Sequence, residues 1–138
     1  HFNTYAPSLA AFYSRPWDSL NDLNRAMLSF FLEALDISTV VKYASKLEAP
    51  GEATTRLVNL IRAAGGSTYL TGAYALDAYL DADELATAKI GLEIQTWKSV
   101  AYPQHYGPFV PDLSIVDLLM HCGNQSRSVL LGQPFHTP

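Results

Sequence analysis

A strand-like run that ends at a glycine and leads into a helix constrains the fold of this chain more than any other feature. Residues 67–71 are mostly β-branched, aromatic or small, Gly72 follows them, and residues 73–80 have a helical pattern. In α/β proteins such turns lie at the carboxyl ends of strands, where ligands bind. The pattern therefore indicates an α/β fold and places a candidate site near Gly72.

Two other segments are predicted to be strands. Residues 39–45 are rich in β-branched and aromatic side chains, and residues 92–98 alternate between two faces. A helix over 53–64, between the first two predicted strands, implies a parallel pair with a right-handed crossover. The chain is thus predicted to be a helix-rich α/β protein, with a short, mainly parallel sheet of about three strands flanked by helices.

Helical periodicity extends over much of the remaining chain. The clearest apolar stripe covers residues 20–34, which Asp18 or Ser19 can cap. A capping box begins another helix at Asp81, and Gly91 is expected to stop it. Further helices are expected over 1–16, 53–64 and 126–131.

Size and composition limit the class of protein. The 138 residues suffice for one modest domain, 1–138. The net charge is −4 and the nine Lys and Arg residues are scattered, which disfavours nucleic acid as a partner. No apolar run approaches the ~20 residues of a membrane span. A single cysteine, Cys122, excludes an internal disulfide. We therefore expect a cytoplasmic protein without a membrane span.

Residues 99–112 are predicted to form an irregular aromatic loop, because three prolines fix backbone angles and remove hydrogen-bond donors. The loop contains three aromatic side chains, which indicates that it packs against the rest of the protein and is ordered. They are Tyr102, Tyr106 and Phe109. His105 lies in the loop and is the one candidate for acid–base chemistry, since burial and a neighbouring group could tune its pKa.

Ser114 and Asp117 have two explanations. We favour a helix start, in which Ser114 is the N-cap, Asp117 bonds back to it and Gly123 stops the helix. In the alternative, the free amides of this helix start also meet an anionic ligand group. His121, in the last turn of the same helix, is explained by its favourable interaction with the helix dipole.

Structural explanations also compete with a site elsewhere. Asn24 interrupts the apolar stripe of 20–34, and it either fastens a neighbouring loop, which we favour, or faces a ligand. Gly72 alone is a weak phosphate-binding signal, and close strand-to-helix packing explains it equally well. The histidines and the cysteine lack chelating spacing, so no metal is expected. Three tyrosines are interpreted as core and rim aromatics: Tyr69, Tyr74 and Tyr79.

Taken together, several segments resemble the WbqC-like protein family. They are Asn24, the YLTG of 69–72 with Tyr79 behind it, the YPQHYGPF of 102–109 and the LSIVDLLMHCG of 113–123. The resemblance covers nearly all of the chain but only the C-terminal part of the family pattern, because the opening strand and aromatic motif of family members are absent. It implies that 1–138 is the C-terminal portion of a larger protein.

The resemblance implies a bacterial cytoplasmic protein of surface-polysaccharide (O-antigen) biosynthesis. Its suspected role is acyl or aminoacyl transfer on an amino sugar carried by a nucleotide, a small-molecule substrate, and no cofactor is implied. The competing hypothesis is a non-catalytic binding or assembly module, which binds ligand or forms a homo-oligomer without turnover. In a third hypothesis the motifs are architectural and the absent N-terminal part carries the site.

We predict that the turn near residue 70, the aromatic loop and the helix start at Ser114 converge on one cleft. There His105 would accept a proton, and Asp117 with Gln104 would orient hydroxyls or the amine, so His105 and Asp117 are the predicted catalytic residues. The predicted substrate-binding residues match the family motifs and are Asn24, Tyr69, Gly72, Tyr79, Tyr102, Gln104, Phe109 and Ser114.

Overall fold

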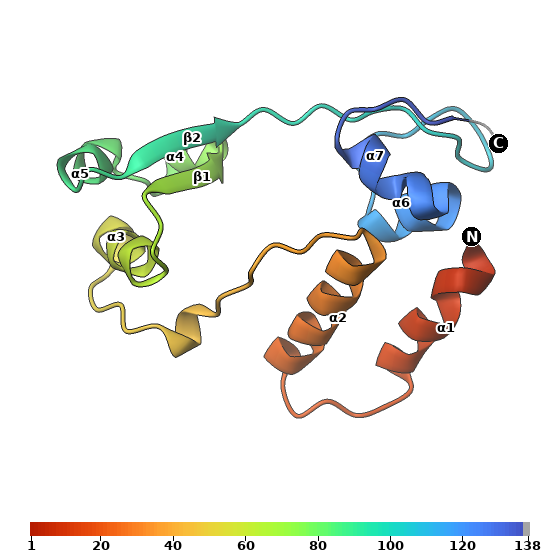
Figure 1. Cartoon of the computed structure of the whole chain (residues 1–138), viewed down its shortest axis with the longest axis horizontal. Coiled ribbons are helices and arrows are strands. Elements are labelled where there is room, and N and C mark those ends of the chain that lie inside the picture. The colour runs from red at the N-terminus through yellow and green to blue at the C-terminus, as the bar shows by residue number, and fades with distance from the viewer. Residues whose placement is uncertain (137–138) are drawn as a thin grey trace. The chain divides into compact units, whose positions relative to one another are not determined.

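The computed structural model of the protein describes residues 1–136 and divides into two compact units (Figure 1). Unit 1 consists of His1–Thr39 and Lys98–Pro138, and unit 2 consists of Val40–Trp97. Each unit has a hydrophobic core of its own, so each is described by itself. A single domain over 1–138, as the C-terminal portion of a larger protein, stays a prediction.

Unit 1 is helical. Ser19, rather than Asp18, caps its longest helix, because the Ser19 side chain accepts a hydrogen bond from the Asp22 amide. The first two helices pack through Phe12 and Phe30, whose rings meet edge to face with centroids 5.8 Å apart. The helices are α1 (Phe2–Tyr13), α2 (Leu20–Ala34), α6 (Ile115–Cys122) and α7 (Ser126–Leu130), with a 3-10 turn, η2 (Gly123–Gln125), before the last.

The core of unit 1 forms around α6 and α7. Leu118, Cys122 and Val129 are buried there, and Tyr102 packs against them from the preceding loop. Gly123 ends α6 with a φ of 54°, a left-handed conformation that favours glycine, so the predicted stop is confirmed.

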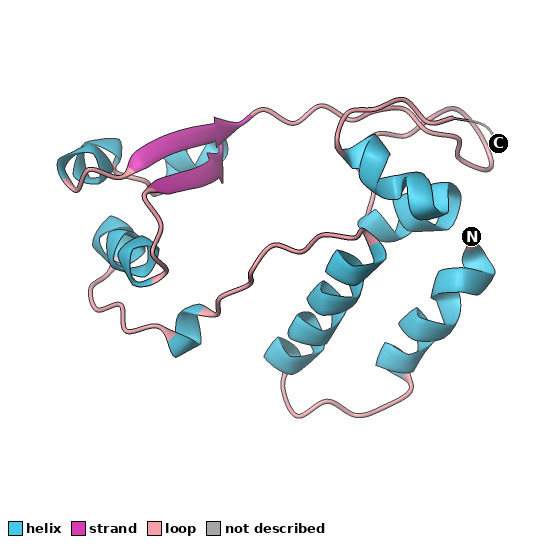
Figure 2. Ribbon diagram, viewed as in Figure 1, coloured by secondary structure: helices cyan, strands magenta, loops and turns pink. Residues whose placement is uncertain are grey.

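Unit 2 carries the sheet. Strands β1 (Thr68–Gly72) and β2 (Gly91–Gln95) run parallel, in register from Thr68 opposite Gly91 to Gly72 opposite Gln95 (Figure 2). Two short helices, α4 (Tyr74–Ala78) and α5 (Ala82–Thr87), connect the strands, and η1 (Ala44–Lys46) and α3 (Ala53–Ala63) precede them. The predicted helix-rich α/β class with a short parallel sheet is therefore confirmed.

The core of unit 2 joins its helices to the sheet. Leu85 of α5 is fully buried at its centre, and Tyr69 and Leu92 pack against the core from the two strands. Leu57 and Ile61 do the same from α3, four residues apart on one helical face. Within residues 1–136, no helix has both the length and the apolar composition needed to cross a membrane.

Residues 39–45 do not form the predicted strand, so the described sheet has two strands rather than three. β-branched side chains favour a strand only where a neighbouring strand pairs with them. None of the described strands pairs with this segment, and Val40 is 79% exposed. Lys42 instead donates a hydrogen bond of 2.6 Å to the Ala64 carbonyl at the end of α3. The predicted crossover through α3 is wrong for the same reason, and α4 and α5 form the connection between the paired strands.

The helix that begins after Asp81 ends earlier than expected. Thr87 is the last residue of α5, and Gly91 is the first residue of β2 rather than a helix stop. Lys89 takes the left-handed conformation, with a φ of 59°. The Ile90 amide then donates to the Leu85 carbonyl at 2.9 Å, which closes the helix end without a glycine.

Candidate functional site

The predicted site residues divide between the two units. Tyr69, Gly72 and Tyr79 belong to unit 2, and the others belong to unit 1. The predicted convergence of the turn near residue 70 with the aromatic loop draws on both units, so it stays a prediction.

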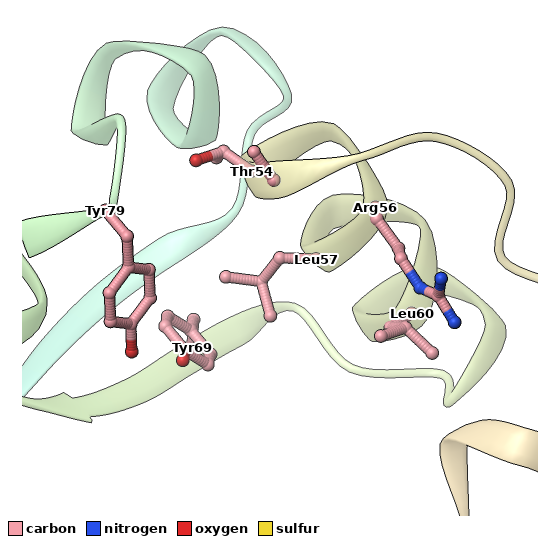
Figure 3. Close-up of a pocket in the computed structure, with 7 residues that line it drawn as sticks. Thr54, Arg56, Leu57, Leu60, Tyr69 and Tyr79 are labelled. Atoms are coloured by element: carbon pink, nitrogen blue, oxygen red, sulfur yellow. The ribbon is translucent and has the colours of Figure 1, made fainter.

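In unit 2, Tyr69 and Tyr79 line one pocket of about 240 Å³ (Figure 3). Figure 3 shows the two tyrosines on one side of the pocket and Arg56 with Leu60 on the other side. Leu57 lies between these two groups. The remaining lining comes from Ala53 and Thr54 at the start of α3. The pocket wall is mostly apolar, with three polar or charged groups at its edges besides the buried Thr54.

The sequence builds this pocket by helical and strand periodicity. Ala53, Leu57 and Leu60 recur at a spacing of three to four residues, which puts them on one face of α3. Tyr69 is half-buried because alternate residues of β1 point toward the core. Thr54 is buried, and its hydroxyl accepts a hydrogen bond from the Asp81 amide at 3.0 Å, which joins α3 to the start of α5.

Burial raises the pKa of Tyr69 above its ordinary value, and the nearby Tyr79 raises it further. The Tyr69 phenol therefore keeps its proton at neutral pH and can act as a donor. Tyr74, by contrast, is 78% exposed and outside the pocket, so its assignment as a core or rim aromatic is wrong. Tyr79 is also largely exposed, as expected for a rim residue.

Gly72 is the last residue of β1 and does not line the pocket. A Cβ atom added at this position would meet no other atom within 4 Å. Close strand-to-helix packing therefore does not require the glycine, and that explanation is wrong. Its role in substrate binding stays a prediction.

A second, more open hollow of about 520 Å³ also has Tyr79 in its lining. Its lining includes Asp77, Asp81 and Asp83 and no basic residue. Asp81 already accepts a hydrogen bond of 3.0 Å from the Glu84 amide as the N-cap of α5. Tyr79 thus lines both an apolar pocket and an acidic hollow.

In unit 1, Asp117 is the centre of a polar network. One of its carboxylate oxygens accepts hydrogen bonds from the Tyr102 hydroxyl at 2.8 Å and from Gln104 Nε2 at 3.0 Å. The Gln104 amide group also bonds the backbone of Val110 in both directions, at 2.8 and 3.1 Å. The network therefore ties both ends of the aromatic loop to the first turn of α6.

Tyr102 is the aromatic anchor of this loop. Its ring meets Phe109 edge to face at 5.2 Å, and burial, followed by the hydrogen bond to Asp117, raises its pKa to about 12. The expectation that the loop packs down is right for these two rings. It is wrong for Tyr106, which is fully exposed and has a φ of 70°.

His121 connects His105 to Asp117. Its Nδ1 atom lies 2.8 Å from the Asp117 carbonyl and 3.3 Å from the Asp117 carboxylate, while its Nε2 atom accepts from the His105 amide at 3.2 Å. With Nε2 as the acceptor of the His105 amide, Nδ1 is the ring nitrogen that faces the acceptor oxygens of Asp117. Besides the predicted interaction with the helix dipole, His121 therefore links the aromatic loop to the first turn of α6.

His105 itself is exposed, so the expected burial of this side chain is absent. Its ring lies against His121 and Tyr106, with centroids 5.0 and 5.8 Å away. None of the described ion pairs or hydrogen bonds joins the His105 ring to a carboxylate. The imidazole is accessible to a substrate, but its proposed role as a base has no orienting partner.

Ser114 is the N-cap of α6, as predicted, and accepts from the Val116 amide at 3.2 Å. The Asp117 amide donates to the Ser114 carbonyl at 2.9 Å, but the Asp117 side chain does not bond back to the Ser114 amide as a capping box requires, and its carboxylate accepts from Tyr102 and Gln104 instead. Asn24 is exposed on α2, whose apolar residues are themselves at most half-buried. The described hydrogen bonds show no fastening role for it, and ligand binding by Asn24 stays a prediction.

Two residues near these sites, His121 and Arg56, are not among the predicted site residues. The position of His121, four residues after Asp117, was a usable signal, since such pairs lie on one helical face. Arg56 had no comparable signal, because its place at the pocket depends on how α3 packs against β1. Among residues 1–136, no three His, Cys, Asp or Glu side chains form a cluster able to hold a metal ion.

The two sets of residues can do different chemistry. The network in unit 1 is satisfied internally, so it can hold a loop in place and present the exposed His105 and Tyr106 rings. The pocket in unit 2 has an apolar wall and a few polar groups, the usual composition of a small-molecule site.

Comparison with known proteins gives the family of the chain. The model of the WbqC-like protein family matches residues 1–129. The chain is also 31% identical over 134 residues to a Mycobacterium tuberculosis protein named Uncharacterized protein Rv1507c, and the match covers 94% of this chain and 57% of that relative. The chain thus spans less than two thirds of the length of the relative. No solved structure matches the chain. The chain belongs to the WbqC-like protein family.

Proposed function

We propose that the chain is the ligand-binding part of a bacterial cytoplasmic protein of surface-polysaccharide biosynthesis. Its substrate would be an amino sugar carried on a nucleotide, and the reaction of the whole protein would be acyl or aminoacyl transfer. The observation that carries this proposal is the pocket in unit 2, which two of the predicted substrate-binding residues, Tyr69 and Tyr79, line together. Membership in the WbqC-like family supports it.

In this proposal the loop in unit 1 supplies the polar contacts to the substrate. Gln104 and Asp117 would orient hydroxyls or the amine, and the exposed His105 would accept a proton. The support is geometric, because Tyr102, Gln104 and Asp117 form one network and His105 meets that network through His121. Such positioning can matter even when no member of the network touches the reacting atoms.

A second candidate is a non-catalytic binding or assembly module. One observation favours it: the Asp117 carboxylate and the His121 ring, which form the carboxylate–imidazole pair of unit 1, already have protein partners. His121 Nε2 accepts the His105 amide, so it is not available as a base in this arrangement. A protein of this kind would bind its ligand without turnover.

Calorimetry with a panel of nucleotide-linked amino sugars, on this chain and on the intact protein, tests the proposal. Tyr79→Ala is expected to weaken binding, because the ring forms one wall of the pocket. Tyr74→Ala is the matched control, since Tyr74 is exposed and outside the pocket. Absence of binding to both proteins, or equal binding by the two variants, would contradict the assignment of the pocket.

Turnover by the intact protein separates the two candidates. Gln104→Ala and Asp117→Asn are expected to lower it if these residues orient the substrate. Unchanged turnover would show that the assignment of roles in the loop is wrong. Binding of a nucleotide sugar without any turnover would support the non-catalytic module instead.

A further inference from the structure

We infer that the pocket in unit 2 takes an amphiphilic anion, with a ring or short acyl chain against its apolar wall and a phosphate or carboxylate at Arg56. This inference deepens the proposed function and rests on its assignment of the same pocket. It adds the chemical class of the part that enters, the orientation of that part, and a residue that the family motifs do not include.

The charges around the pocket favour an anion. Arg56 is the one charged residue in the lining, which contains no Asp or Glu, although the chain as a whole carries a net charge of −4. Among the described residues, none forms an ion pair or a hydrogen bond with the Arg56 guanidinium, whereas Lys42 and Arg62 of the same unit donate to backbone carbonyls. A guanidinium binds phosphate and carboxylate groups through two parallel hydrogen bonds.

The wall of the pocket favours an apolar group over a bare sugar. Leu57, Leu60 and Ala53 present only aliphatic carbon, and the Thr54 hydroxyl is engaged by the Asp81 amide. A sugar ring needs several hydrogen-bond partners for its hydroxyls, because each unpaired polar group that is buried lowers affinity. A nucleobase, an aromatic ring or a short acyl chain needs few hydrogen-bond partners.

The size of the pocket limits how much of a ligand enters. At about 240 Å³ it is smaller than the ~300–1,000 Å³ typical of sites that enclose a whole drug-sized molecule. One apolar end of a ligand therefore fits, with the rest outside. Tyr69 and Tyr79 line the pocket, and their hydroxyls can donate hydrogen bonds to an entering ring.

The acidic hollow fixes the orientation. It shares Tyr79 with the pocket and is lined by Asp77, Asp81 and Asp83, which repel an anionic group. Arg56 lies on the side of the pocket away from Tyr79 (Figure 3). The anionic end of the ligand therefore lies at Arg56.

Calorimetric titration of this chain with two anions and their neutral counterparts tests the inference. The pairs are uridine monophosphate with uridine, and hexanoate with 1-hexanol. We expect at least one anion to bind about tenfold more tightly than its neutral counterpart, since a charge-assisted contact to an exposed guanidinium is of that order. The pair that shows the difference distinguishes an aromatic base from an acyl chain as the entering group.

Arg56→Gln is expected to abolish the difference within that pair while leaving binding of the neutral probe unchanged. Arg56 is exposed on α3, so the substitution removes the charge without disturbing the core. Arg25→Gln, the same chemical change at a half-buried position of α2 in unit 1, is expected to keep the full difference. Because both the ligand and the guanidinium are exposed, raising the salt concentration should reduce the difference in the unchanged protein.

Equal binding of anion and neutral probe, an unchanged difference in Arg56→Gln, or no binding of any of the four probes would overturn the inference. These outcomes are distinct from failure of the proposed function. If hexanoate binds in an Arg56-dependent way and no nucleotide sugar binds, the inference stands and the proposed substrate is wrong. If nucleotide sugars bind equally well to the unchanged protein and to Arg56→Gln, the proposed function stands and the inference is wrong.

Discussion

The two units hold their tyrosines in contrasting ways. In unit 1, Tyr102 is half-buried and its hydroxyl donates to Asp117, so the residue fastens a loop to α6. In unit 2, Tyr69 and Tyr79 face an aliphatic wall across a pocket. All three belong to the same set of family motifs. Membership in a motif therefore does not distinguish a residue that holds the fold from one that can meet a ligand.

The surrounding charges explain the contrast. In unit 1 the Asp117 carboxylate already accepts from the Tyr102 hydroxyl and the Gln104 amide, and it lies 3.3 Å from the His121 ring. The pocket of unit 2 has a cation at one edge and no acid, so Arg56 keeps its hydrogen-bonding capacity. The two sites therefore differ in which hydrogen-bonding groups still lack a partner. An external ligand can bind such groups.

Replacing a core residue should have the largest effect and tests whether the two units are separate. Leu85 is fully buried in unit 2, so Leu85→Ala is expected to lower the free energy of unfolding by about 2–5 kcal/mol through lost burial and a cavity. Hydrogen exchange over the whole chain should show the loss of protection in residues 40–97. Leu76→Ala, at a largely exposed position of α4, is the control. An equal loss in unit 1 would break the comparison, because the two cores would then unfold as one.

Removing the carboxylate of unit 1 should have the next largest effect. Asp117→Ala leaves the Tyr102 hydroxyl and the Gln104 amide without their acceptor, which is expected to cost about 1–3 kcal/mol. Denaturant unfolding measures the change. Asp36→Asn is the control, because it removes an exposed ion pair with Arg127 that is worth less than about 1 kcal/mol, and asparagine tolerates the positive φ of 51° at this position. Equal effects of the two substitutions would show that the network does not hold the loop.

Helix caps sharpen the comparison at a smaller scale. Ser114→Ala in unit 1 and Asp81→Ala in unit 2 each remove a side chain that accepts a backbone amide, and each is expected to cost about 1 kcal/mol. Ser114→Asn should restore most of the stability, since asparagine is an equally good cap. Thermal unfolding of the four proteins measures these changes. A Ser114→Asn variant as unstable as Ser114→Ala would indicate a role for Ser114 beyond capping.

The smallest expected effect concerns the pH dependence of stability, through Tyr102. Its pKa is raised from 10.0 to about 12, so the unfolded phenol loses its proton before the folded one does. The stability that comes from this shift is fully present below the unfolded value and is lost as pH rises through the folded value. Denaturant unfolding at several alkaline pH values should therefore show a smaller decline for Tyr102→Phe than for the unchanged protein. Tyr106→Phe, at a fully exposed ring, should decline like the unchanged protein. Identical declines in both variants would contradict the raised pKa.

Much of the fold was predictable from local signals. The apolar stripe of α2, the cap at Ser114 and the stop at Gly123 each depend on residues within one or two helical turns. The alternation in β2 also follows from neighbouring residues. The strand predicted over residues 39–45 is absent from the described sheet, because a β-branched run becomes a strand only if another strand pairs with it. Such pairing is a property of the whole fold.

The candidate site was predictable only in part. The pairing of Asp117 with Tyr102 and Gln104 joins segments more than ten residues apart, and their spacing gives no sign of it. The exposure of His105 likewise depends on how the loop packs. The role of Arg56 depends on the contact of α3 with β1, and the predicted residues Tyr69 and Tyr79 marked only one side of that pocket.

Cys122 lies in the core of unit 1, and it is the one cysteine of the chain. Burial, with the nearby Asp117 charge, raises its pKa to about 11, so the folded protein presents a covered and protonated thiol. Thiol reagents attack only an accessible thiolate. The rate at which such a reagent modifies the chain therefore reports how often unit 1 opens, and unit 2, which contains no cysteine, adds nothing to the signal.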